Sequence, residues 1–111
     1  MATKCRIKHN TYGGIWFKEM TFLKAGDFKN PHTHNFDHVT FITAGSVKVY
    51  EIPVDSDGDF NLSDKVEIGV FSASSHIKVP KNMVHYVEAM EDNSIAYCVE
   101  ALHDGMDTSE L

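Results

Sequence analysis

Turn residues divide the chain into short segments that are rich in β-branched and aromatic side chains. The clearest segment, residues 15–24, contains Ile, Trp, Phe and Thr and lies between Gly14 and Gly26. Further segments of the same kind are 37–43, 46–52, 65–71, 76–79, 83–90 and 94–102. No stretch has apolar residues at the helical period of about 3.6 over three turns. Many short strands joined by tight turns predict an all-β fold, either a sandwich or a small barrel.

The length and charge of the chain limit its organisation and its partners. A chain of 111 residues is long enough for one domain and too short for two well-packed ones. We expect one domain over residues 1–111, with a barrel core at about 14–102 and a frayed acidic tail at 104–111. Ten Lys and Arg residues against sixteen Asp and Glu give a net charge of −6. Nucleic acids and anionic membrane surfaces both need clustered positive charge, so neither is an expected partner.

The two cysteines and the N-terminal sequence favour a cytoplasmic location. Cys5 and Cys98 are far apart and form neither a CxxC motif nor a disulfide framework, whereas secreted domains of this size usually have more cysteines. No segment has the roughly 20 apolar residues that span a bilayer. The first residues also lack the apolar core of a signal peptide. We expect two buried or half-buried thiols.

One acidic segment has the alternation of a calcium-binding loop. Asp55, Asp57 and Asp59 alternate within a turn. An EF-hand loop has glycine at its sixth position and glutamate at its twelfth, where this chain has Phe60 and Val66. We therefore interpret the segment as the solvated tip of a hairpin.

Four of the seven histidines lie in two short segments. His32, His34 and His38 share one face if a single strand runs unbroken through them. His85 follows a proline near the start of another expected strand. Several neutral imidazoles that converge on one point bind a divalent metal at about 2.0–2.2 Å. We predict a metal site at these four residues and structural or surface roles for the others, His9, His76 and His103.

The spacing around the first three histidines resembles the first motif of the cupin superfamily, G(X)5HXH(X)3–4E(X)6G. Gly26, His32, His34 and Gly45 stand at the positions that this motif requires. His38 occupies the position of the glutamate, which is the one substitution in the motif.

The second cupin motif, G(X)5PXG(X)2H(X)3N, is matched more loosely. Pro80 and His85 occupy their positions, while Ser74, Asn82 and Ala89 replace the two glycines and the asparagine. Asparagine is a mild departure because it tolerates the left-handed backbone that glycine adopts.

The resemblance, which covers residues from about 14 to 102, implies a double-stranded β-helix, or jelly roll, of two antiparallel sheets. It implies a metal inside this barrel, held by His32, His34, His38 and His85, as in the single-domain cupins with an all-histidine site. Some of those cupins are manganese proteins with oxygenase-like activity. A neutral ligand set leaves the full charge on the metal, which favours anionic substrates or hydroxide.

The cofactor that we expect is one divalent transition metal per chain, because imidazole ligands select against Mg and Ca. Iron and manganese are favoured; zinc, nickel, copper and cobalt are the alternatives. A barrel that has lost its metal is the competing interpretation.

Strand alternation also predicts which residues line the pocket. The lining residues that it predicts are Phe36, Thr40, Ile42, Val87 and Tyr97. A mostly apolar pocket of this kind suits a small aromatic or enolic ligand. We identify no catalytic residue beyond the metal ligands. Asp37 should face the surface, and Glu51 or Glu88 would reach the pocket only if the alternation were shifted by one residue.

These features leave three classes of function open. The first is a metal-dependent oxidoreductase of the dioxygenase type acting on an enol, diketone or phenol, with a lyase or isomerase as a variant. The second is a module that binds a small ligand or senses the metal, and the third is a structural barrel.

A homodimer is implied by the resemblance, because small cupins commonly pair through a sheet. The segment 15–24 supports it, since both of its faces have large apolar residues, namely Trp16, Met20 and Phe22 on one face and Phe17 and Leu23 on the other.

Overall fold

The computed structural model describes residues 2–102, and these residues form nine β-strands and one short 3-10 turn. His103 and the tail at 104–111, for which we expected a surface role and fraying, lie outside the described residues. No helix in the described part is long and apolar enough to cross a membrane. The elements are β1 (Arg6–Tyr12), β2 (Ile15–Phe22), β3 (Phe28–His32), β4 (His38–Ala44), β5 (Ser46–Glu51), η1 (Leu62–Asp64), β6 (Val66–Ser72), β7 (His76–Val79), β8 (His85–Ala89) and β9 (Ser94–Ala101).

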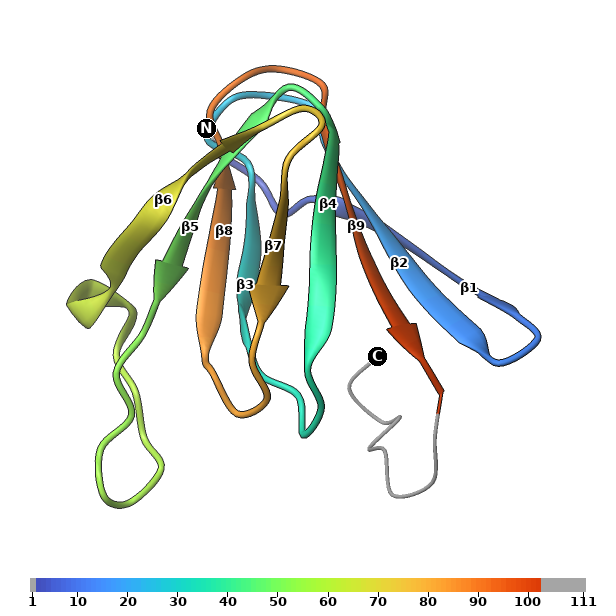
Figure 1. Ribbon diagram of the computed structural model, residues 1–111. Helices are drawn as coiled ribbons and strands as arrows, with labels where there is room; N and C mark the ends of the chain where they lie inside the picture. The colour runs from blue at the N-terminus through green and yellow to red at the C-terminus, as the bar shows by residue number, and fades with distance from the viewer. Residues whose placement is uncertain (1, 103–111) are drawn as a thin grey trace.

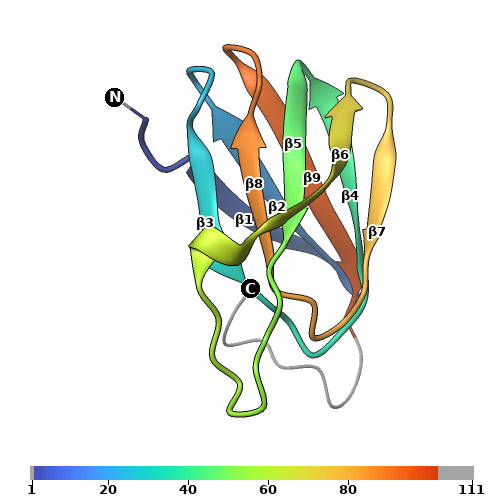
Figure 2. The same ribbon diagram turned by 90° about the vertical axis from the view of Figure 1, so that its left-hand side faces the viewer.

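The strands form two antiparallel sheets that face each other as layers (Figures 1 and 2). One sheet has the order β1-β2-β9-β4-β7 and the other has the order β3-β8-β5-β6. Consecutive strands β3 and β4 lie in different sheets, so the chain crosses from one layer to the other between them. The all-β prediction with two antiparallel sheets is confirmed.

Alternation along the strands places the core between the sheets. In β2, residues Trp16, Lys18, Met20 and Phe22 are buried, while the residues between them are half-buried on the outer face. Ala96 and Cys98 of β9 continue this interior face. Cys5 and Cys98 are both buried and free, as expected, and burial raises the pKa of both thiols.

The sequence patterns did not predict β1 and β3. Every residue of β1 except Asn10 is exposed, so this strand forms through its pairing with β2 and not through a buried face of its own. β3 contains Pro31 and is half-buried throughout, which removes the alternation that identifies a strand.

The prediction of one unbroken strand through His32 and His38 is wrong. β3 ends at His32 and β4 begins at His38, and residues 33–37 form a connection without regular structure. Because these two strands belong to different sheets, the chain has to turn between the histidines.

The glycine positions of the two cupin motifs have the backbone conformation that favours glycine. Gly26 and Gly45 have φ of 92° and 67°. Ser74 and Asn82, which replace the glycines of the second motif, have φ of 76° and 65°. The backbone therefore preserves the motif where the side chains depart from it.

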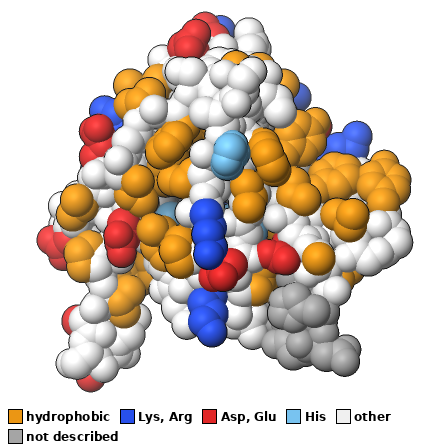
Figure 3. Space-filling model, in the orientation of Figure 1, with side chains coloured by type: hydrophobic (Ala, Val, Ile, Leu, Met, Phe, Trp, Pro, Cys, Tyr) orange, Lys and Arg blue, Asp and Glu red, His pale blue; other side chains and the backbone are white. Residues whose placement is uncertain are grey.

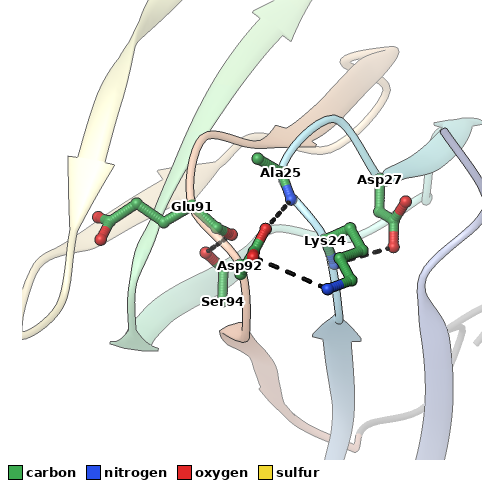
Figure 4. A network of polar contacts seen from close by, with 6 residues as sticks. All are labelled: Lys24, Ala25, Asp27, Glu91, Asp92 and Ser94. Atoms are coloured by element: carbon green, nitrogen blue, oxygen red, sulfur yellow. Dashed lines mark hydrogen bonds and ion pairs between the residues drawn. The ribbon is translucent and has the colours of Figure 1, made fainter. Parts of the chain in front are cut away.

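Polar contacts close one end of the barrel (Figure 4). The backbone N–H of Ala25 donates to Asp92 Oδ1 at 2.8 Å, which joins the β2–β3 and β8–β9 connections. Ser94 Oγ donates to the carbonyl oxygen of Glu91 at 2.8 Å, and Ser46 Oγ donates to the Glu91 carboxylate at 2.8 Å. These bonds hold three connections together at the end where β2, β4 and β8 finish (Figure 1).

Candidate metal centre

Four histidines gather at the other end of the barrel. His32 ends β3 and His85 begins β8, and the two residues are direct partners in the register of that sheet. His38 begins β4 in the opposite sheet, and His34 lies in the 33–37 connection. The site therefore takes side chains from both layers and from the segment that joins them.

The distances between the rings suit a single metal ion. The centre of the His32 ring lies 4.1 Å from that of His85 and 4.9 Å from that of His34. The His38 ring lies 5.3 Å from His34 and 5.7 Å from His85, and His34 lies 6.4 Å from His85. Metal–nitrogen bonds of about 2.1 Å in octahedral geometry place ring centres about 4.7 Å apart for adjacent ligands and about 6.6 Å for opposite ones. The observed distances fall mostly within this range.

Backbone carbonyl groups fix the tautomer of two of the rings, those of His32 and His85. His32 Nδ1 lies 3.2 Å from the carbonyl oxygen of Asn30, and His85 Nδ1 lies 3.1 Å from that of Met83. A carbonyl oxygen only accepts hydrogen bonds, so each Nδ1 carries the proton and each Nε2 keeps its lone pair. Backbone carbonyls orient metal-binding histidines in this manner.

His38 provides the strongest indication of a missing ligand. Both of its ring nitrogens are buried and have no hydrogen-bond partner among the residues that the structure describes. Leaving a buried polar group without a partner costs about 1–3 kcal/mol, so such groups need an explanation. A metal ion bound to one nitrogen would remove that cost.

The ring nitrogens of the four histidines do not converge on one point in this structure. Within residues 2–102, the one group of three metal-binding side chains whose ligand atoms lie within 4.8 Å of one another is Asp55, Asp57 and Asp59. Rotation of the histidine rings about χ2, a broad torsion, is needed to close the site around an ion. The four residues fit a metal in ligand type, in burial and in ring spacing.

Burial keeps the imidazoles neutral, as metal binding requires. Desolvation, followed by the charge of His85, lowers the pKa of His38 to about 3. Desolvation also lowers the pKa of His85 to about 4, although the Met83 carbonyl opposes it. The pKa of His32 is lowered further still, by burial first and then by the proximity of His85 and Lys18.

Lys18 is a site residue that the sequence analysis missed. Its side chain is 2% exposed, and its Nζ lies 3.5 Å from His32 Nε2 and 5.9 Å from the centre of the Trp16 ring. The alternation that placed Trp16, Met20 and Phe22 on the interior face also places Lys18 there. The signal was present in the sequence, but the pattern was read for apolar residues alone.

The predicted pocket residues divide between the interior and the outside. Thr40 and Val87 line a small interior cavity, Phe36 is buried and stacks on His34 with ring centres 4.8 Å apart, and Ile42 is buried in the core. The placement of Tyr97 in the pocket is wrong. Tyr97 is half-buried on the outer face of its sheet, because Ala96 and Cys98 are the inward-facing residues of β9.

The space for a ligand lies at the mouth and not inside the barrel. The interior cavity beside His32 and His85 has a volume of about 10 Å³, enough for one water-sized group. A hollow of about 400 Å³ lies outside it, lined by Pro31, His32, Thr33, His34, Asn35, Phe60 and Asn82. Within the described residues the mostly apolar pocket that we expected is reduced to this small cavity, and a ligand has to approach through the outer hollow.

The two acidic segments that the sequence singled out are exposed at the surface. Asp37 is exposed, accepts a hydrogen bond from the N–H of Lys81 at 2.8 Å, and lies 3.7 Å from Lys78 Nζ. Asp55 Oδ1 accepts from the N–H groups of Asp57 and Asp59, each at 2.9 Å, which is the hydrogen bonding of a tight turn. Both segments have the surface character that the sequence predicted.

No protein-family model and no curated protein sequence matches the chain. Solved structures do match it. It is similar to KdgF from Halomonas sp. (16% identity, TM-score 0.63, covering 91% of this chain and 81% of KdgF). It is also similar to a cupin domain from Bordetella pertussis (13% identity, TM-score 0.63, covering 93% and 97%). A variant of oxalate decarboxylase from Bacillus subtilis matches over 100% of this chain and 29% of its own length (15% identity, TM-score 0.71).

These structures share their fold with a chain whose sequence is largely different from theirs. The similarity covers 91% of this chain for KdgF and 93% for the Bordetella domain. The two antiparallel sheets therefore form a jelly roll, and the chain has the cupin fold.

Proposed function

We propose that this chain is a metal-dependent oxidoreductase of the dioxygenase type that acts on a small enolic, diketone or phenolic substrate. The observation that carries the proposal is the group of four histidines from both sheets and the connection between them, with the buried nitrogens of His38 lacking a partner among the described residues. Mn(II) centres are reported for oxalate decarboxylase from Bacillus subtilis, which has the same fold, and this supports manganese or iron here.

The residues of this chain would hold one divalent transition metal and admit a substrate from the mouth. His32, His34, His38 and His85 are the proposed ligands, and when bound the metal would supply Lewis acidity and redox chemistry. His32 and His34 line the 400 Å³ hollow, so a substrate there would meet the site directly. Phe36, packed on His34, keeps that ring in place.

Metal analysis tests the ligand set. Untagged protein purified without added metal is expected to contain about one Fe or Mn per chain by mass spectrometry. His38→Ala is expected to lower this content by about tenfold or more, because a ligand is lost. His76→Ala, which removes an exposed histidine of β7, is the matched control and should retain the metal. Absence of metal from the wild-type protein would exclude the proposal.

Oxygen uptake then tests the reaction class. Metal-loaded protein that consumes oxygen with an enolisable or phenolic compound supports the dioxygenase. Zinc in place of iron or manganese, or turnover without oxygen, would favour a lyase or isomerase. Tight ligand binding without turnover would favour a binding module.

We also propose that the protein is a cytoplasmic homodimer. The outer face of the β1-β2-β9-β4-β7 sheet contains an apolar hollow of about 340 Å³ lined by Phe17, Phe41, Thr43, Tyr97 and Val99. In Figure 3 hydrophobic side chains gather over the same part of the molecule. Apolar surface of this kind commonly marks a protein interface, and a second copy of the sheet is the proposed partner.

Light scattering after size exclusion tests the dimer. The wild-type mass is expected to be that of two chains. Phe41→Glu together with Phe17→Glu should reduce it to that of one chain, because two charges would be buried at the interface. Val66→Glu on β6, where Val66 is 59% exposed, is the control and should remain dimeric. A monomeric wild-type protein would contradict the proposal.

A further inference from the structure

Lys18 is the one lysine or arginine side chain in the described part of the chain that is fully buried. It extends from β2 into the barrel, and Cys98 of β9 and Thr40 of β4 lie beside it in the register of the sheet. These three side chains form a row across the interior face. The ammonium group lies at the end of this row nearest His32.

The contacts of Lys18 leave its charge without a counter-ion. His32 Nε2, at 3.5 Å, is a neutral acceptor, and the Trp16 ring, at 5.9 Å, offers only its electron-rich face. Among residues 2–102 the ion pairs of lysine are Lys24–Asp92, Lys48–Glu67 and Lys78–Asp37. A buried ammonium group with no carboxylate is unusual, since buried charges are normally paired.

A second lysine adds to the positive field. Lys29 of β3 is half-buried and opposite Val87, which lines the interior cavity. Burial, and after it the charge of Lys18, lowers the pKa of Lys29. β3 ends at His32 and pairs with β8, which begins at His85, so Lys29 lies on the strand that leads to the histidine site.

We propose that Lys18 binds a carboxylate of the substrate that the histidine site takes, so that the substrate is a small organic acid. The inference rests on the proposed function. If a divalent cation binds His32 Nε2, the Lys18 ammonium group loses its hydrogen-bond acceptor and lies beside a second positive charge. The four histidines contribute no negative charge. A carboxylate oxygen placed between Lys18 and His32 supplies both the missing acceptor and the missing charge.

The two cavities fit a ligand of this kind. His32 lines both the interior cavity of about 10 Å³ and the outer hollow of about 400 Å³. The interior has room for one oxygen atom beside His32, and the hollow has room for the rest of a small acid. Lys18 lines neither cavity, so its flexible side chain has to turn the ammonium group from His32 toward that oxygen.

The experiment compares malonate with malonamide, its neutral amide. Each is titrated into metal-loaded and metal-free protein and followed by equilibrium dialysis and by the fluorescence of Trp16, the one tryptophan of the chain. Malonate is expected to bind the wild-type protein more tightly than malonamide. Lys18→Met should weaken malonate binding by about tenfold or more and leave malonamide binding unchanged. Lys8→Met, on the exposed part of β1, is the matched control.

Metal content and thermal unfolding are measured on every sample, and Lys18→Gln is used if the methionine variant does not fold. If the protein holds its metal but Lys18→Met binds malonate as tightly as the wild type does, the inference about Lys18 is wrong and the proposed function stands. Equal binding of malonate and malonamide by the wild type also overturns it. If the protein holds no metal, the proposed function fails, and the titration of metal-free protein decides whether Lys18 binds anions.

Discussion

Lowering the pH from 7 to 4 is expected to reduce the free energy of unfolding of the metal-free protein by about 2–3 kcal/mol for each of His38 and His85. In the folded protein burial lowers the pKa values of these residues to about 3 and 4, from the 6.5 that is usual for histidine. Below about pH 6.5 the unfolded chain therefore takes up protons that the folded barrel does not. Stability is complete above this pH and is lost progressively toward pH 4.

Guanidinium unfolding at pH 7, 6, 5 and 4, followed by Trp16 fluorescence, measures this loss. His38→Gln removes one titrating group. The loss of unfolding free energy between pH 7 and pH 4 should therefore be smaller by the contribution of His38 alone. His76→Gln, in which an exposed histidine of β7 is replaced, should leave the profile unchanged. Parallel profiles for the wild type and His38→Gln would show that His38 is not held neutral by the fold.

Gly45→Ala is expected to reduce the free energy of unfolding by about 3 kcal/mol, from a strained backbone and a steric clash together. Gly45 has a φ of 67°, a conformation that disfavours any residue with a Cβ. An added Cβ would lie 2.9 Å from the Cα of Ser94. That neighbour is backbone, so it cannot move aside as a flexible side chain would. Ser94 Oγ also accepts a hydrogen bond from the N–H of Ser46 at 3.2 Å, so its position is fixed.

Gly14→Ala is the matched control, since an added Cβ there meets nothing within 4 Å. It should change the free energy of unfolding by about 0.5 kcal/mol or less. Both variants can be measured in the same urea titration. Similar stability for the two variants would mean that the β4–β5 turn relaxes around the new side chain.

The sequence predicted those strands that bury one of their own faces. β2 and β9 alternate between buried and half-buried residues, and the sequence pattern located both to within two residues. β1 and β3 have no such alternation, because β1 depends on its pairing with β2 and β3 contains Pro31. The order of buried and exposed residues along one strand does not show which other strand it will pair with. Tyr97 was misplaced because β9 was assigned the wrong inward face.

The histidines of the site were predicted by their spacing, although the geometric argument for three of them was wrong. His32 and His38 meet because β3 and β4 lie in facing sheets, and not because they share a strand. The spacing of the cupin motif predicted that these histidines share one site, whereas alternation along one strand gave the wrong reason for it. Lys18 was missed for a different reason. A charged residue at an interior position is normally an exception to the pattern, and it becomes informative only when its burial is known.

The two ends of the barrel are held together in different ways. At the end that contains Gly45, hydrogen bonds within the chain connect the turns permanently. At the other end the N–H groups of Lys81 and Asn82 donate to Asp37 and to the His34 carbonyl oxygen. An ion bound to both His85 and His38, which come from opposite sheets, would add a removable cross-link between the layers there. Its release should accelerate amide hydrogen exchange at the starts of β4 and β8 far more than at their ends. Binding of the proposed metal would therefore restrain the two sheets relative to each other at the histidine end of the barrel.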